Sequence, residues 1–148
     1  MPAGVEGIVI DSSLAATWLF DDEATPATDA LLHGLEQTRG IVPALWHFEL
    51  TNMLVQAERR KRIGSDGATA LLGFIDSLPI ETDSELPGTH RRDVWVLARR
   101  HKLTSYDAAY LELAVRSGLP LATLDRELAR AATECGISVL PNPKRRAR

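Results

Sequence analysis

Short apolar runs alternate with longer amphipathic segments along this chain. Runs of β-branched and aliphatic residues, bounded by glycine, proline or an acid, predict buried strands at 7–11, 40–42, 80–82, 121–123 and 138–140. Between them, apolar residues that recur every three or four positions predict helices at about 14–20, 26–38, 46–57, 65–78, 93–101, 104–117 and 125–136.

Strands that alternate with helices favour βα units, and such units form a largely parallel sheet with helices on both faces. The predicted fold is therefore a three-layer α/β/α sandwich with short strands. No linker, repeat or low-complexity block divides the chain, so we expect one domain over residues 1–148, with a core at about 7–140 and a basic tail at 144–148.

The composition is that of a soluble globular protein, with 45% hydrophobic and 25% charged residues in 148. No apolar run is long enough to cross a bilayer and no signal-like segment begins the chain, so we expect a cytoplasmic protein that does not contact the membrane. The net charge of −3 provides no global attraction for nucleic acid. Local basic clusters nevertheless permit RNA binding, at 59–62, 91–92, 99–102 and 144–148; two of them, 59–62 and 99–102, also suit helix ends.

Several reaction classes find little support in the sequence. Cys135 is the single cysteine, which excludes an internal disulfide and a thiolate metal cluster, and its place near a helix end suggests packing. The four histidines are scattered, so the sequence predicts neither a zinc site nor a Cys/His nucleophile pair. It also lacks a glycine-rich phosphate loop and a GxSxG motif.

Four acids occupy positions that can converge. Asp11 and Asp125 each follow a predicted strand, and the carboxyl ends of parallel strands share the edge where ligands bind. Glu49 lies on a helical stripe that also holds Asn52. Asp107 begins a largely apolar helix, three residues after Thr104. Each acid also has an ordinary explanation: Asp11 and Asp125 as helix caps, Asp107 as part of a capping box, and Glu49 as solvated charge.

If these acids lie close together, their repulsion disfavours ionisation of all four, and a bound divalent cation would offset their negative charge. Carboxylate ligands favour Mg²⁺ or Mn²⁺ over zinc, and such an ion suits phosphodiester hydrolysis by an activated water. Polar side chains near the acids are candidates to support the ligands, namely Ser13, Asn52 and Thr123. Three further acids near the cleft are interpreted as solvated charge, namely Asp22, Glu23 and Glu112.

Four segments, IVIDSS, VPALWHFELTNML, LTSYDAAYLELA and LATLDRELARAA, together resemble the PIN-domain family, specifically VapC-type toxin ribonucleases of type II toxin-antitoxin systems. The resemblance runs from about Gly7 to Leu140 and leaves out the basic tail. It implies a PIN-like fold and an Mg²⁺ or Mn²⁺ site that is both catalytic and metal-binding, formed by Asp11, Glu49, Asp107 and Asp125, with Ser13, Asn52 and Thr123 at matching polar positions.

The resemblance also implies an endoribonuclease that cleaves tRNA, rRNA or mRNA, forms a homodimer, and is held inactive by a VapB-type antitoxin whose terminal segment enters the acidic cleft. Two other functions stay open: a non-catalytic PIN-like module that binds RNA or protein, and a housekeeping PIN nuclease. The sharpest structural expectation concerns Asp107. Its carboxylate should face the other three acids, whereas a pure cap would turn back toward Thr104.

Overall fold

The computed structural model describes residues 7–142, and five short strands form its central sheet. The strands lie in the order β3-β2-β1-β4-β5, and every neighbouring pair is parallel. Their bounds are β1 Ile8–Ile10, β2 Gly40–Val42, β3 Ile80–Thr82, β4 Leu121–Ala122 and β5 Val139–Leu140. All five predicted strands are present, each within two residues of its expected bounds.

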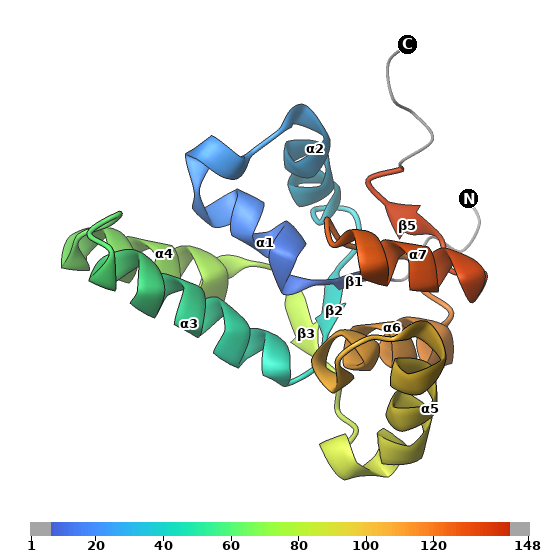
Figure 1. Cartoon of the computed structure of the whole chain (residues 1–148). Helices are drawn as coiled ribbons and strands as arrows, with labels where there is room; N and C mark the ends of the chain where they lie inside the picture. The colour runs from blue at the N-terminus through green and yellow to red at the C-terminus, as the bar shows by residue number, and fades with distance from the viewer. Residues whose placement is uncertain (1–6, 143–148) are drawn as a thin grey trace.

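Seven α-helices within residues 7–142 cover this sheet, four on one face and three on the other (Figure 1). Connections between parallel strands are right-handed, so the step β1-β2-β3 in one direction places α1–α4 together, and the return through β4 to β5 places α5–α7 opposite. This confirms the predicted α/β/α sandwich. The helices are α1 Ser12–Leu19, α2 Pro26–Gly34, α3 Leu45–Arg59, α4 Ser65–Ser77, α5 Arg91–His101, α6 Ser105–Ser117 and α7 Arg126–Glu134.

The core lies between the sheet and its most buried helices. Val9 and Ile10 of β1 have no exposed surface, because helices pack on both faces of a central parallel strand. Trp46 packs into this core from α3 and Leu111 from α6. Strands β2 and β3 pack tightly at Gly40, where a Cβ atom would overlap the end of the side chain of Ile80, its register partner. A larger residue at this position would force the Ile80 side chain to move.

Helix boundaries differ from the sequence pattern in two places. The helix predicted to reach about Thr38 ends at Gly34, and the chain continues as turns with hydrogen bonds from Glu36 and Gln37 to carbonyls three residues earlier. Helix α5 begins at Arg91 rather than near Asp93, and follows a 3₁₀ turn, η2, at Pro87–His90; a second such turn, η1, spans Asp21–Glu23. No helix within residues 7–142 has the length and apolarity to span a membrane. The basic tail at 144–148 lies outside the described residues.

The strand order creates one reversal point. From β1 the chain moves to β2 and β3 on one side, and it later crosses back to place β4 on the other side of β1. In open α/β sheets, ligands bind beyond the carboxyl ends of the strands at such a point. The crevice between the ends of β1 and β4 is therefore where a functional site is expected.

Candidate active site

Asp11 lies directly after β1, at the N-cap position of α1, and 4% of its surface is exposed. Its carboxylate forms no capping hydrogen bond with that helix, so the expected cap is not made, although the nearby backbone N–H of Ser13 acts to lower the pKa of Asp11. Its Oδ2 instead accepts hydrogen bonds from Ser13 Oγ at 2.7 Å and Thr123 Oγ1 at 2.6 Å. Burial raises the pKa of Asp11 above its ordinary value, these hydrogen bonds oppose the rise, and the charge of Asp125 adds to it.

Thr123 connects the ends of β1 and β4. Ile10 pairs with Ala122 in parallel register, so Asp11 and Thr123 leave the sheet side by side. The Thr123 hydroxyl donates to Asp11 and accepts a hydrogen bond from the backbone N–H of Asp125 at 3.0 Å. One hydroxyl therefore positions both strand-end acids, which is a supporting role of the kind expected for Thr123.

Asp125 is the N-cap of α7, as its position before a helix predicted. Its Oδ1 accepts a hydrogen bond from the backbone N–H of Leu128 at 3.0 Å. The adjoining loop is held to α1, because Ser13 Oγ accepts from the N–H of Leu124 at 3.1 Å. Capping uses one carboxylate oxygen and fixes the direction of the group. The second oxygen, Oδ2, receives no hydrogen bond from the described residues.

Glu49 reaches the same region from the middle of α3. Its Oε1 accepts a 2.5 Å hydrogen bond from the hydroxyl of Tyr110, a fully buried residue of α6. Burial, together with the hydrogen bond and charge of Glu49, raises the pKa of Tyr110, so the phenol remains a donor. Sequence reasoning missed Tyr110. Its spacing of three residues from Asp107, on one face of a helix, was the available signal.

Asp107 lies in the first turn of α6, and Thr104 caps that helix by accepting the Asp107 backbone N–H at 3.1 Å. The pKa of the Asp107 carboxyl rises from 3.8 to about 6. Burial is the largest cause, followed by the negative charges of Asp125, Asp11 and Glu49, while a hydrogen bond with Thr104 acts in the opposite direction. Asp107 therefore takes part in the cap and also lies within electrostatic range of the other three acids.

No lysine, arginine or histidine within residues 7–142 forms an ion pair with any of these four acids. Over the same residues, no three His, Cys, Asp or Glu side chains form a group that could hold a metal ion as they stand. Magnesium commonly retains several waters and uses only one or two protein carboxylates. The oxygen donors of this cluster fit such a hard cation, which would relieve the repulsion that raises the pKa of Asp107.

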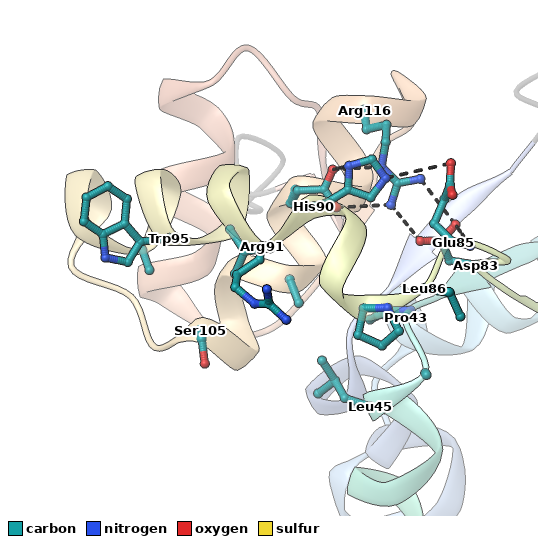
Figure 2. Close-up of a pocket in the computed structure, with 16 residues that line it drawn as sticks. Pro43, Leu45, Asp83, Glu85, Leu86, His90, Arg91, Trp95, Ser105 and Arg116 are labelled. Carbon is teal, nitrogen blue, oxygen red and sulfur yellow. Dashed lines mark hydrogen bonds and ion pairs between the residues drawn. The ribbon is translucent and has the colours of Figure 1, made fainter.

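A cavity of about 390 Å³ opens between the start of α3, the segment from β3 to η2, α5 and α6 (Figure 2). Leu45 on its wall is one helical turn before Glu49, and Ser105 is two residues before Asp107. Much of the wall is apolar, formed among others by Pro43, Leu86, Val94 and Trp95. Glu49 and Asp107 therefore lie on helices that also form the cavity wall, although none of the four acids lines the cavity.

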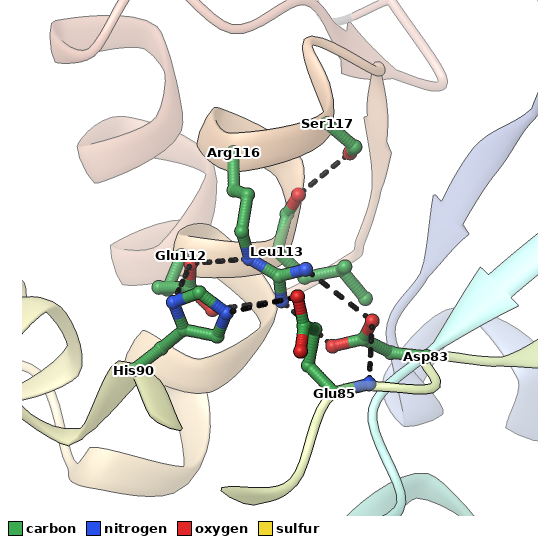
Figure 3. Close-up of polar contacts among 7 residues, drawn as sticks. All are labelled: Asp83, Glu85, His90, Glu112, Leu113, Arg116 and Ser117. Atoms are coloured by element: carbon green, nitrogen blue, oxygen red, sulfur yellow. Dashed lines mark hydrogen bonds and ion pairs between the residues drawn. The ribbon is translucent and has the colours of Figure 1, made fainter. Parts of the chain in front are cut away.

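Charged side chains close one side of this cavity (Figure 3). Arg116 donates to Glu112 at 2.8 Å and to Asp83 at 2.6 Å, and His90 Nδ1 lies 3.8 Å from Glu112. Burial works against ionisation of Asp83, but the hydrogen bonds from Arg116 and from the Glu85 backbone N–H, together with the positive charge of Arg116, outweigh it and lower the pKa of Asp83. The interpretation of Glu112 as solvated charge is wrong, because only 7% of this residue is exposed and its carboxylate is paired.

The remaining predicted residues form no hydrogen bond or ion pair with the four acids within residues 7–142. Asn52 is exposed on α3 and lines a different cavity, and no hydrogen bond within residues 7–142 joins it to the cluster. Asp22 and Glu23 are exposed, as expected, and pair with Arg62 at 2.5 and 3.0 Å. Their partner is the arginine at the end of the 59–62 basic cluster, which is therefore partly neutralised.

Cys135 does contact a histidine, which the sequence did not predict. Its Sγ lies 3.5 Å from His101 Nε2, and His101 Nδ1 lies 3.0 Å from Glu134. Burial raises the pKa of the Cys135 thiol. A thiol with a raised pKa is a poor nucleophile at neutral pH, so the packing interpretation of Cys135 stands despite this contact.

Comparison with known proteins matches residues 8–134 to the model of the PIN domain. The chain belongs to the PIN domain family. Within it, the chain is 29% identical over 126 residues to Ribonuclease VapC3 of Pyrobaculum aerophilum, which covers 82% of this chain and 92% of that protein. It is 33% identical over 106 residues to Ribonuclease VapC1 of Mycobacterium tuberculosis, which covers 71% of this chain and 77% of that protein. These relatives support the VapC-type branch of the family.

The fold has a solved counterpart in the crystal structure of PAE2754 from Pyrobaculum aerophilum. The two chains superpose with a TM-score of 0.65 at 28% identity, over 92% of this chain and 91% of the other. The arrangement of strands and helices described above is thus shared with that structure over nearly its whole length.

Proposed function

We propose that this protein is a toxin-type endoribonuclease, which hydrolyses RNA phosphodiester bonds with a water activated by a divalent metal ion. The observation that carries the proposal is the acid cluster. Asp11, Glu49, Asp107 and Asp125 come from four separate segments and lie at the reversal point of the sheet, without a cation from the described residues. The names of the VapC ribonuclease relatives support the same chemistry.

Each carboxylate in this proposal is oriented by a neighbour within the fold. Ser13 and Thr123 hold Asp11, and Tyr110 holds Glu49. The cap that Asp125 provides to α7 sets the direction of its free oxygen. Such supporting contacts matter because a catalytic group must be held close to its productive geometry.

Within the group Asp11, Glu49, Asp107 and Asp125, one or two carboxylates would bind the metal ion, Mg²⁺ or Mn²⁺, directly, and the others would reach it through bound waters. When bound, such an ion makes a water more acidic and offsets the negative charge that develops on the phosphate. The acids by themselves repel an RNA phosphate, so RNA cleavage should require the metal.

The proposal extends to partners and location. We infer a homodimer in the cytoplasm, neutralised by a VapB-type antitoxin, because the relatives carry VapC names. A small antitoxin gene should lie next to the gene for this protein. Without such a neighbour, a housekeeping PIN nuclease would be the better assignment.

Substitution of Asp107 tests the activity. Wild-type protein should cut members of a panel of labelled RNAs with Mg²⁺ or Mn²⁺ and none with EDTA. Asp107→Asn should lower the cleavage rate by about 100-fold or more, because it removes a charge from the metal-binding cluster. Gel analysis of single-turnover reactions measures the rate, and circular dichroism checks that the fold is retained.

Asp66→Asn is the matched control, because Asp66 is also an acid in the first turn of a helix, is exposed and lies on α4. It should cleave as fast as wild type. Undiminished cleavage by Asp107→Asn would refute the assignment. RNA binding without metal-dependent cleavage by wild type would instead favour a non-catalytic module.

A further inference from the structure

Helix α5 carries an unusual concentration of unpaired positive charge. Its eleven residues include one acid, Asp93, and four arginines, namely Arg91, Arg92, Arg99 and Arg100. None of the four forms an ion pair within the described part of the chain, whereas Arg39, Arg62, Arg116 and Arg130 do. Arg59, Arg60 and Arg126 are unpaired there as well, but α5 carries four such arginines on one helix.

An exposed tryptophan lies among these arginines. Trp95 is 52% exposed, although it is large and apolar, and the guanidinium of Arg99 lies over its ring at 4.5 Å from the centroid. Nearby Leu86 is 74% exposed on the same cavity rim. Aromatic side chains beside cations are typical of surfaces on which the bases of single-stranded nucleic acids stack.

The 390 Å³ cavity lies between this surface and the start of α3. Trp95 and Arg91 line it from α5, and Figure 2 shows the Arg91 side chain extending toward the part of the cavity that holds Leu45 and Ser105. Leu45 and Ser105 are the wall residues nearest in sequence to Glu49 and Asp107. Leu45 and Glu49 share one face of α3, so an RNA strand held in the cavity would lie one helical turn from Glu49.

We propose that helix α5 and the cavity below it form a binding site for single-stranded RNA, in which a base stacks against Trp95 and flanking phosphates contact Arg91 and Arg92. The site rests on the proposed ribonuclease function and adds a surface that would hold the RNA strand beside α3, one helical turn from Glu49. The apolar wall of the cavity can contact any base without forming hydrogen bonds to the base edge. The site should therefore bind RNA strands with little preference for their sequence.

A second copy of the chain fits this surface less well. A twofold contact through α5 would bring its arginines opposite the same arginines of the partner, and like charges repel. RNA phosphates provide the opposite charge, and RNA bases provide flat apolar surface for Trp95. Both features of the helix are then used by one ligand.

The charge part of the site is tested by RNA binding in EDTA, where no cleavage occurs. Fluorescence anisotropy with a labelled single-stranded RNA that wild type cleaves should show a Kd about tenfold higher for Arg91→Ala/Arg92→Ala. The slope of log K against log salt should fall by about 1.4, because each arginine that neutralises a phosphate of a single strand contributes ~0.7 to it. The matched control is Arg59→Ala/Arg60→Ala, which removes two exposed arginines at the far end of α3 that form no ion pair within residues 7–142. This control should bind as wild type does.

The stacking part has a different signature. Trp95→Ala should raise the Kd by about tenfold and leave the salt slope unchanged, because stacking releases no counterions. Leu72→Ala, which shortens another exposed apolar residue on α4, is its control. Trp95→Phe should largely restore affinity, since phenylalanine also stacks, but should remove the quenching of tryptophan fluorescence that wild type shows on adding RNA.

The outcomes separate this site from the ribonuclease assignment. If wild type cleaves RNA while the α5 variants bind and cleave as it does, the binding site is wrong and the function stands. If the α5 variants change the molar mass in size-exclusion chromatography with light scattering but not RNA affinity, the surface is a protein interface and the proposal is likewise overturned. If RNA binding needs α5 but no RNA is cut, the site stands and the function fails.

Discussion

The two ends of α6 hold acids in opposite electrical surroundings. At the N-terminal end, Asp107 meets three other acids without a cation from the described residues, and its pKa rises to about 6. Toward the C-terminal end, Glu112 pairs with Arg116, which also binds Asp83 and lowers the pKa of Asp83. One helix thus carries one compensated and one uncompensated group of acids.

This difference separates a structural cluster from a candidate catalytic one. Glu112 can be almost fully buried because Arg116 supplies its opposite charge within the fold. The acids around Asp107 have no such partner among the described residues, so their repulsion opposes folding and is retained only where some other benefit offsets it. A cation from outside would provide the missing charge. Three substitutions sharpen this comparison.

The largest effect on stability is expected for Arg116→Ala. It leaves Glu112 buried without a partner and frees Asp83, and breaking a buried pair by removing one partner is strongly destabilising. Because 27% of the Arg116 side chain is exposed, we expect a loss of roughly 2–3 kcal/mol in the free energy of unfolding. Urea denaturation measures it.

A second variant checks the cause of that loss. Adding Glu112→Gln to Arg116→Ala should recover part of the stability, because it removes the uncompensated charge while keeping the shape of the side chain. A loss in Arg116→Ala that is no larger than that of an exposed arginine would contradict the structural role of this cluster.

An effect of the opposite sign is expected for Asp107→Asn in EDTA. Removing one of four repelling charges should raise the free energy of unfolding at pH 7 by about 1 kcal/mol, a value reduced from the size of the pKa shift because Asp107 is only half-buried. The measurement is urea denaturation of both proteins between pH 3.5 and about 7.5.

The raised pKa of Asp107 determines how its contribution to the free energy of unfolding changes with pH. The folded state binds the Asp107 proton more tightly than the unfolded state does, so the stabilisation is complete below 3.8 and is lost as pH rises through about 6. The advantage of Asp107→Asn should therefore grow over that interval. Asp83, whose pKa is lowered, should instead stabilise above 3.8 and lose its effect as pH falls further. Equal pH profiles for wild type and Asp107→Asn would refute the electrostatic coupling.

The smallest effect is expected for Arg130→Ala. Arg130 pairs with Glu127 and Glu134 on α7, but all three side chains are about half exposed or more. Water and salt screen such pairs, so the urea midpoint should not change measurably. A clear loss here would mean that exposed pairs stabilise this fold as much as the buried Arg116 cluster does.

Local patterns along the chain predicted the elements of the fold well. Strand positions followed from short apolar runs, because a parallel strand is buried on both faces and tolerates few polar residues. Helix ends were less certain: α2 stops at Gly34, since the chain must turn to enter β2. Boundaries of this kind depend on packing against neighbours and not on the segment's own residues.

Helix caps, too, could be predicted where they depend on local contacts and could not where they depend on distant ones. Asp125 and Thr104 cap their helices as their positions predicted, because a cap contacts backbone groups two or three residues away. Asp11 occupies an equivalent position but binds Ser13 and Thr123 instead. Thr123 lies 112 residues from Asp11 in the chain, and only the register of β1 with β4 brings the two together.

The sequence by itself determined which acids stand at strand ends and helix starts, and it determined the charge of α5. Those properties depend on residue type and local spacing. The tertiary structure decided which charged groups are paired. Arg116 forms ion pairs with both Glu112 and Asp83, and the Tyr110 hydroxyl donates a hydrogen bond to Glu49. The α5 arginines form no ion pair with a carboxylate within residues 7–142. Pairing depends on distances between segments remote in the chain, and these distances exist only once the sheet and its two helical layers have assembled.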